Sequence, residues 1–143
     1  MFMGSFNHSI DPKNRVFVPS KFRDGLSDNF VITAGLDGCL YLCTYSDWES
    51  FVEKLAELPM KKETRELQRF FMQNAAEAAV DKQGRVIIPA SLKSYAGIDK
   101  DVVFVGAIRK VELWSKERLE NHTPVKDMDD IVETLSNEYG LKF

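Results

Sequence analysis

The feature that most constrains this fold is a motif of twelve residues that occurs twice. Residues 11–22 (DPKNRVFVPSKF) align without gaps on residues 81–92 (DKQGRVIIPASL). Both copies place Asp, Arg, Val and Pro at the same positions, and three further positions stay apolar. The likeness continues, shifted by one or two residues, to LYLC at 40–43 and VELW at 111–114. Such an ordered series marks a duplicated unit, so two copies of one small fold are expected.

Each unit is expected to begin with a strand, a tight turn and a second strand. Both turns, DPKN and DKQG, end on a residue that tolerates a positive φ, Asn14 and Gly84. The apolar residues after each turn favour a strand, and the proline that follows suits the first turn of a short helix. The expected strands are residues 4–9, 16–18, 75–80 and 86–88, with short helices at Pro19 and Pro89.

Later segments predict one hairpin in each unit and helices between and after the units. A capping-box pattern from Ser46 to Glu49 predicts a helix that Pro59 ends, and a second helix is expected over residues 61–73. Two more are expected, near Ser115 and in the acidic tail. The hairpins are expected to pair residues 30–34 with 39–44 and residues 102–106 with 110–114.

Apolar stripes on these helices are interpreted as core or subunit contacts. The stripes are Trp48, Phe51, Val52, Leu55 and Leu58, then Leu67, Phe70 and Phe71, then Met128, Ile131, Val132 and Leu135. Together the elements predict a β-rich α+β fold. Its segments are a first unit with its helix (1–58), a connecting helix (59–74), a second unit (75–120) and an acidic helical tail (121–143).

Several classes of protein are excluded by what the chain lacks. No apolar run is long enough for a membrane span, and the N-terminus has no signal-peptide core, so a cytoplasmic protein is expected. Cys39 and Cys43 sit about 13 Å apart along one strand, too far for a disulfide, and are expected to be packing thiols. His8 and His122 have no metal-ligand spacing, and no catalytic motif occurs. Neither an enzyme, a cofactor, a metal ion nor a small-molecule substrate is expected.

The charge of the chain is unevenly distributed. Its net charge is -3, which taken alone argues against a nucleic-acid partner. Residues 11–23 nevertheless carry a local +3 and residues 81–93 a local +2, which leaves -8 on the rest. Basic charge gathered on a repeated motif is the electrostatic footprint of a nucleic-acid-binding protein.

The repeated Asp-x-x-x-Arg pattern allows two interpretations. The aspartate accepts backbone N–H groups of its own turn and the arginine neutralises it, which is a purely structural role. Alternatively, an arginine fixed beside a turn is a rigid fork for phosphate or for a guanine edge. The first interpretation is favoured for Asp11 and Asp81, and the second for Arg15 and Arg85.

The two motifs resemble the MraZ family of bacterial transcriptional regulators. Supporting features are the opening residues 1–17, residues 35–40 (GLDGCL), Phe70 and Phe71 before the second unit, and residues 114–118 (WSKER). The resemblance covers residues 1–120 and extends to the AbrB, SpoVT and MazE class of swapped-hairpin DNA-binding modules. It implies a double-split β-barrel built from two half-modules, and a homo-oligomeric ring. It also implies binding to short repeated promoter boxes of the division and cell-wall gene cluster on the nucleoid, usually as a repressor.

The family's DNA-facing motif falls on residues of both turns. The resemblance implies DNA contacts by Asp11, Lys13, Arg15, Asp81 and Arg85. Charge and position add Lys21, Arg23, Lys82 and Lys93 as candidates. Asn14 stands where the family commonly has glycine, and the tail from about residue 121 matches the family only loosely.

An alternative is a protein-interaction module on the same fold, such as an antitoxin-like partner binder or a ring scaffold. The acidic amphipathic tail favours it. A pull-down in which a second protein, and not DNA, retains the chain after nuclease treatment would distinguish it from a promoter-binding regulator.

Overall fold

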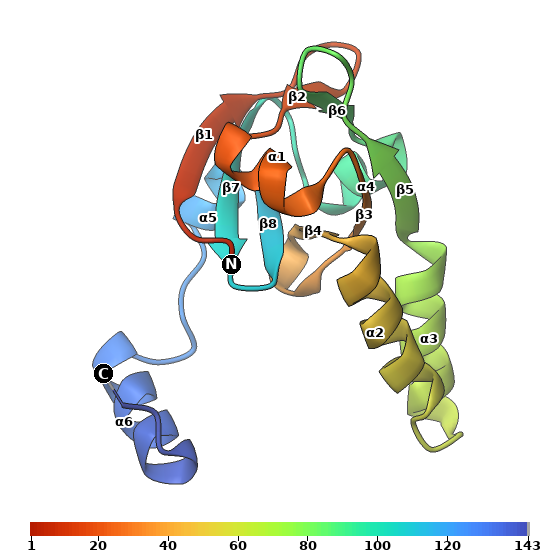
Figure 1. The fold of residues 1–143 in the computed structure, drawn as a ribbon. Helices are drawn as coiled ribbons and strands as arrows, with labels where there is room; N and C mark the ends of the chain where they lie inside the picture. The colour runs from red at the N-terminus through yellow and green to blue at the C-terminus, as the bar shows by residue number, and fades with distance from the viewer. Residues whose placement is uncertain (143) are drawn as a thin grey trace.

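Both repeats fold as strand, turn, strand, short helix and hairpin in the computed structural model, which describes residues 1–142 (Figure 1). The first unit comprises β1 (Ser5–Ser9), β2 (Arg15–Phe17), α1 (Ser20–Leu26), β3 (Asn29–Ala34), a 3-10 turn (Leu36–Gly38) and β4 (Leu40–Cys43). The second comprises β5 (Ala75–Ala79), β6 (Arg85–Ile87), α4 (Ala90–Tyr95), β7 (Asp101–Ala107) and β8 (Lys110–Ser115). The remaining helices are α2 (Tyr45–Ala56), α3 (Lys62–Gln73), α5 (Lys116–Glu120) and α6 (Met128–Tyr139). The duplication and both predicted hairpins are confirmed.

The two units exchange their first strands within a six-stranded antiparallel sheet of order β1-β7-β8-β4-β3-β5. Strand β1 pairs with β7 of the second unit, with Phe6 opposite Phe104, and β5 pairs with β3 of the first unit, with Ala76 opposite Ile32. The two hairpins meet at the centre, where β4 pairs with β8. Each repeat therefore completes the sheet of the other.

A separate two-stranded ribbon is formed by β2 and β6, one strand from each unit. Val16 lies opposite Val86 in this ribbon, and both are 1% exposed because they face the core. The large sheet has free edges at β1 and β5, so residues 1–142 form an open sheet with a ribbon and not a closed barrel. The predicted β-rich α+β class is correct.

One hydrophobic core lies between the sheet, the ribbon and the helices α1 and α4. Phe22 and Leu26 of α1 are almost completely buried, and Leu92 of α4 occupies the place equivalent to Phe22. The Phe2 and Phe6 rings make edge-to-face contacts with Phe22 at centroid distances of 5.8 and 5.2 Å. The N-terminal segment is therefore part of the core.

Three predicted helix starts are wrong by one or two residues. Helix α2 begins earlier than the Ser46 capping box, because Thr44 is the N-cap and its Oγ1 accepts the Asp47 N–H at 3.1 Å. Strand β4 ends at Cys43, which leaves Thr44 in the extended conformation that an N-cap needs. Pro19 and Pro89 are likewise N-cap residues, one position before the first helical turn.

The predicted helical stripes are buried unequally. Leu55 is the buried residue of α2, and it lies on the side where the Phe51 ring meets Phe71 of α3 at 4.9 Å. Leu58 stays 41% exposed, and α6 has no buried residue. Within residues 1–142, no helix has both the length and the apolar character needed to cross a bilayer.

Cys39 and Cys43 are buried and unpaired, which confirms them as packing thiols. Burial raises the pKa of the Cys39 thiol to about 12 and that of the Cys43 thiol to about 11. A thiolate is the nucleophile in alkylation and disulfide exchange, so both residues are expected to be inert at neutral pH.

We expect a thiol reagent such as Ellman's reagent to label the native protein at pH 8 at least 100-fold more slowly than the urea-unfolded protein, because at that pH well under 1% of either buried thiol is ionised. Absorbance of the released thiolate measures the rate. Native labelling as fast as labelling in urea would contradict burial of these thiols.

Candidate nucleic-acid interface

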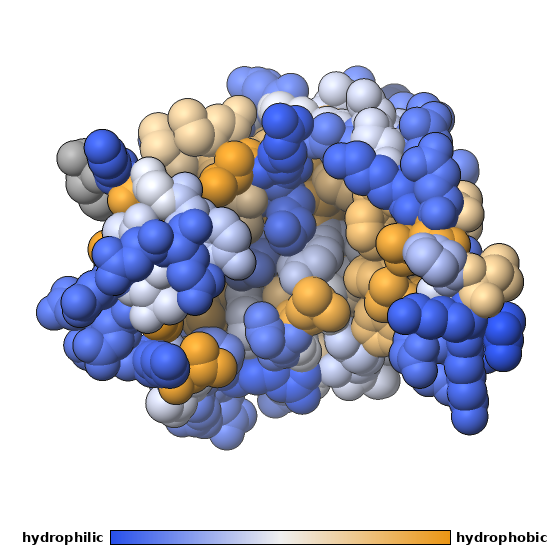
Figure 2. Space-filling model, turned by 90° about the horizontal axis from the view of Figure 1, so that it is seen from below, coloured by the Kyte–Doolittle hydropathy of each residue, from blue (hydrophilic) through white to orange (hydrophobic). Residues whose placement is uncertain are grey.

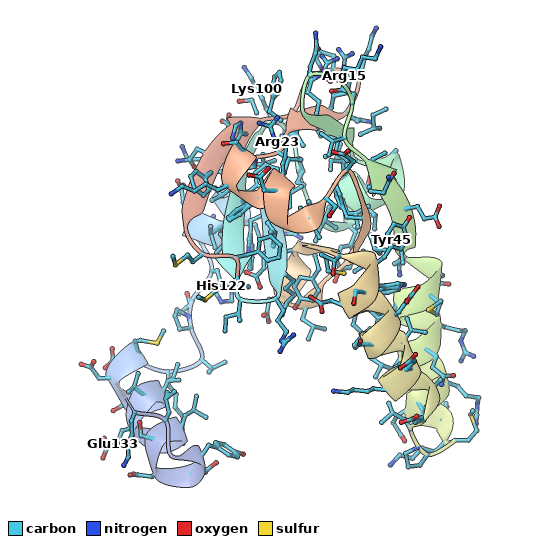
Figure 3. The ribbon with its side chains drawn as sticks, in the orientation of Figure 1. Arg15, Arg23, Tyr45, Lys100, His122 and Glu133 are labelled. Atoms are coloured by element: carbon cyan, nitrogen blue, oxygen red, sulfur yellow. The ribbon has the colours of Figure 1, made fainter. Side chains whose placement is uncertain are left out.

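The two turns of the repeated motif lie together at one end of the molecule. They form the loops beside β2 and β6 at the top of Figure 1, and Figure 3 shows Arg15 at this end. Antiparallel pairing of β2 with β6 sets Arg15 opposite Ile87 and Arg85 opposite Phe17. The ribbon therefore brings together residues that are 70 positions apart in the sequence.

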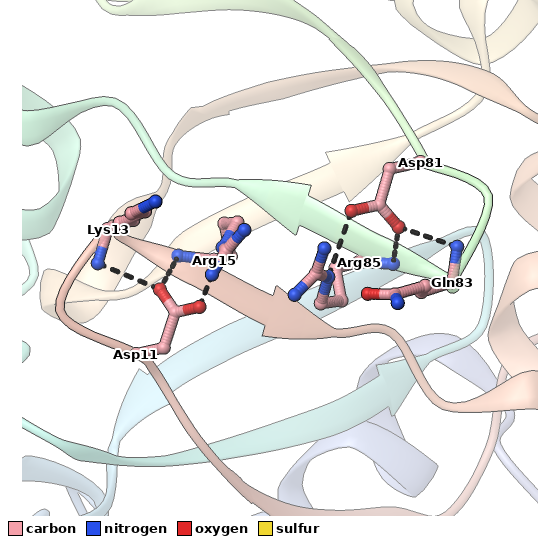
Figure 4. Close-up of polar contacts among 6 residues, drawn as sticks. All are labelled: Asp11, Lys13, Arg15, Asp81, Gln83 and Arg85. Carbon is pink, nitrogen blue, oxygen red and sulfur yellow. Dashed lines mark hydrogen bonds and ion pairs between the residues drawn. The ribbon is translucent and has the colours of Figure 1, made fainter.

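Each aspartate holds its turn by three hydrogen bonds (Figure 4). Oδ1 of Asp11 accepts the backbone N–H groups of Lys13 and Arg15 at 2.9 and 2.8 Å, and Oδ2 accepts Nε of Arg15 at 2.7 Å. Asp81 repeats the arrangement with Gln83 and Arg85, all three distances being 2.9 Å. The expected structural role of both aspartates is confirmed.

The same geometry orients each arginine and leaves part of its guanidinium group available to a ligand. Only Nε of Arg15 and of Arg85 enters the ion pair, so the two Nη groups of each guanidinium lie outside it. The side chains are 29% and 21% exposed, enough for contact with a ligand. The two interpretations of the motif are thus compatible, because a guanidinium oriented by its own turn loses little further entropy on binding.

Both turns need a left-handed residue at their fourth position, as the sequence indicates. Asn14 has φ 62° and Gly84 has φ 86°. The Asn14 carbonyl accepts the Ile88 N–H at 2.8 Å, and the Gly84 carbonyl accepts the Val18 N–H at 3.0 Å. These bonds tie each turn to the strand of the other unit.

Arg23 and Lys93 occupy equivalent positions in the two motifs, and each reaches the turn of the opposite unit. Lys93 Nζ donates to Oδ1 of Asn14 at 3.1 Å. The Arg23 guanidinium lies where a side chain at position 84 would stand, with Cζ 3.0 Å from an ideal Cβ. The Asn14 and Lys93 pair thus corresponds to the Gly84 and Arg23 pair, and each cation lies against a turn of the other unit.

The three remaining candidates, Lys13, Lys21 and Lys82, are exposed. Lys13 and Lys82 lie in the turns themselves. Lys21 lies on α1, the helix that follows β2 in the sequence. Lys13 with Arg15 and Lys82 with Arg85 therefore lie at the two opposite ends of the ribbon.

Phe17 and Ile87 are two residues of this surface that the sequence analysis missed. They are 48% and 63% exposed, on the outer face of the ribbon beside the arginines. The Arg85 guanidinium carbon lies 5.9 Å from the centre of the Phe17 ring. The sequence does contain a signal for them. Side chains two positions apart on a strand share a face, so Phe17 lies on the face of Arg15, and Ile87 on the face of Arg85.

The ionised state of both turn carboxylates is stabilised. The backbone N–H of Arg15, followed by its side chain, lowers the pKa of Asp11, and Arg85 lowers the pKa of Asp81 in the same way. The folded pKa lies below the ordinary value of 3.8, so these carboxylates stabilise the fold above pH 3.8. That contribution is lost as the pH falls through the lower folded pKa.

We expect carbon-detected NMR titration to give midpoints below 3.8 for both turn aspartates in the folded protein. Removing the partner cation by Arg15→Ala should move the Asp11 midpoint upward and leave that of Asp81 in place, since each turn is internally paired. Equal upward shifts at both sites would show that the two turns are electrically coupled. A midpoint at 3.8 in the native protein would contradict the ion pair.

Comparison with known proteins is consistent with this duplicated architecture. The family model described as "MraZ protein, putative antitoxin-like" matches twice, over residues 1–71 and 70–128. Proteins named transcriptional regulator MraZ from Lachnoclostridium phytofermentans and Clostridium beijerinckii are 54% and 48% identical, covering 100% and 99% of this chain and 100% of each relative. The corresponding protein of Clostridium acetobutylicum is 45% identical over 99% of the chain and 100% of its own length. The chain belongs to the MraZ family.

Proposed function

We propose that this chain is a transcriptional regulator that binds double-stranded DNA through its two Asp-x-x-x-Arg turns. The observation that carries the proposal is the pair of oriented arginines, Arg15 and Arg85, on one exposed ribbon in a protein that is otherwise acidic. The names of its relatives support the regulatory role.

The ribbon has the features of a major-groove reader. A two-stranded antiparallel ribbon fits the major groove, and an arginine there recognises a guanine edge through its two Nη groups. Exposed Lys13 and Lys82 would contact the flanking phosphates. Phe17 and Ile87 would supply the apolar contact that distinguishes the methyl group of thymine.

Two features of the chain support an AbrB-like module within one polypeptide. They are the reciprocal exchange of β1 and β5 and the ribbon contributed equally by both units. We propose that residues 1–58 and 75–120 are the half-modules of a double-split, swapped-hairpin fold, joined by 59–74 and followed by the tail 121–143.

One subunit offers few DNA contacts, so assembly is part of the proposal. A homo-oligomeric ring presenting several ribbons to spaced promoter boxes would raise affinity through effective concentration. The protein would act as a repressor of the division and cell-wall gene cluster, in the cytoplasm on nucleoid DNA.

Footprinting on the DNA upstream of the protein's own gene tests the function. Protection of evenly spaced short repeats at low salt is the expected result. Absence of protection at low salt, with the chain retained by a second protein after nuclease treatment, would favour the protein-interaction module instead.

A further inference from the structure

Helix α6 presents an apolar stripe that the rest of the chain leaves uncovered. None of its residues is buried, and Met128, Val132 and Leu135 are 57%, 43% and 40% exposed. These residues and Tyr139, which is 76% exposed, recur at the spacing that places side chains on one face of a helix. A stripe of this kind favours burial against a partner surface.

A groove of matching character lies between α2 and the sheet. Its volume is about 870 Å³, and its walls include Trp48, Phe51, Tyr41 and Phe71. Figure 2 shows this lower face with hydrophobic side chains around a hollow. Helices α2 and α6 each have 12 residues, about 18 Å, so a helix of the length of α6 can lie along α2.

Charge supports the match at one rim of the groove. The β7–β8 hairpin tip contributes Arg109 and Lys110, and the Arg109 side chain is 85% exposed with only a loose 4.0 Å pair to Asp47. The α6 stripe is bordered by Asp129 and Glu138. The α2 rim carries Lys54 between Glu53 and Glu57, whereas the hairpin tip carries two cations. The acidic border of α6 therefore fits against the hairpin tip.

We propose that α6 of one copy docks in this groove of a second copy. Figures 1 and 3 place α6, with Glu133, on the flank of the sheet away from α2 and α3. The His122 ring packs on Trp114 at 5.5 Å, which leaves residues 123–127 as the connection. Each copy then offers one helix and one groove, a head-to-tail contact of the kind that generates rings. The proposal rests on the assembly part of the proposed function and does not involve the DNA contact.

Cysteine cross-linking tests which copy supplies the helix. Ser50, which lines the groove, and Leu135 are changed singly to cysteine in separate full-length proteins. Oxidation of a mixture of the Ser50→Cys and Leu135→Cys proteins is expected to give a disulfide-linked dimer that neither protein gives alone. A third protein carries both cysteines in one chain. An intramolecular disulfide in this double variant, with no dimer from the mixture, would overturn the proposal by placing α6 in the groove of its own chain.

The mass of the assembly tests the interface independently. Val132→Asp with Leu135→Asp is expected to reduce the wild-type oligomer to the single chain of 16.3 kDa in light scattering. Thr134→Asp with Asn137→Asp adds equal charge on the opposite face of α6 and should leave the mass unchanged. An unchanged oligomer mass in the stripe variant would overturn the α6 interface but would not contradict assembly into a ring. Footprinting of the same variant measures DNA binding separately.

Discussion

The double variant Arg15→Ala, Arg85→Ala is expected to lose about 100-fold or more in affinity for promoter DNA. Loss of one arginine at a guanine edge costs about 1–3 kcal/mol, so each single variant should weaken binding by roughly 5- to 150-fold. Both arginines stand in equivalent turns, and the ribbon brings both to the same face. Fluorescence anisotropy with a labelled promoter fragment measures the affinity.

A salt series shows whether base or phosphate contacts are lost. Each lost phosphate contact should reduce the slope of log affinity against log salt by about 0.9, whereas a lost guanine contact leaves the slope nearly constant. Arg65→Ala with Arg69→Ala on α3 removes equal charge away from the turns and is the matched control. Unchanged affinity together with an unchanged slope in the turn variant would disprove direct contact by these arginines.

The second large effect is expected at Gly106, where any side chain collides with main chain. An ideal Cβ there would lie 2.5 Å from the Met3 Cα, and the Gly106 N–H already donates to the Gly4 carbonyl at 2.8 Å. Gly106→Ala must therefore push the N-terminal segment off β7 and withdraw Phe2 from the core. We expect a loss of about 3 kcal/mol in the free energy of unfolding, measured by urea denaturation.

A double-mutant cycle with Phe2→Ala tests the cause of this loss. Phe2 is 7% exposed against Phe22, so its removal alone should cost about 3 kcal/mol. If Gly106→Ala acts by withdrawing the same ring, the two costs will not add. Additive costs, or a cost for Gly106→Ala below about 0.5 kcal/mol, would contradict the mechanism.

Local features of the fold were predictable because their determinants lie close together in the sequence. The turn needs an acceptor at Asp11, a left-handed residue at Asn14 and a strand after it, all within a few positions. The hairpins follow from apolar runs separated by short turns. Duplication made these predictions firmer, since the second copy repeats the pattern with different side chains.

Features that depend on long-range pairing could not be read in the same way. Nothing in residues 5–9 indicates that β1 pairs with β7 rather than with its own hairpin, because either edge accepts a short antiparallel strand. The support of Asn14 by Lys93 joins positions 79 apart and was missed for this reason. Alternation with Val16 and Val86 indicates that Phe17 and Ile87 share a face with the arginines, but the pairing that brings the two residues onto one ribbon joins strands of different units.

The exchange of β1 and β5 has an evolutionary consequence. Two identical units that exchanged strands as separate chains would obey a strict two-fold axis, and every substitution would occur in both. Joined in one polypeptide, the halves mutate independently, and they have diverged to Asn14 with Lys93 on one side and Gly84 with Arg23 on the other. A surface built from both turns consequently has a direction, and a ligand that spans it meets two distinguishable ends.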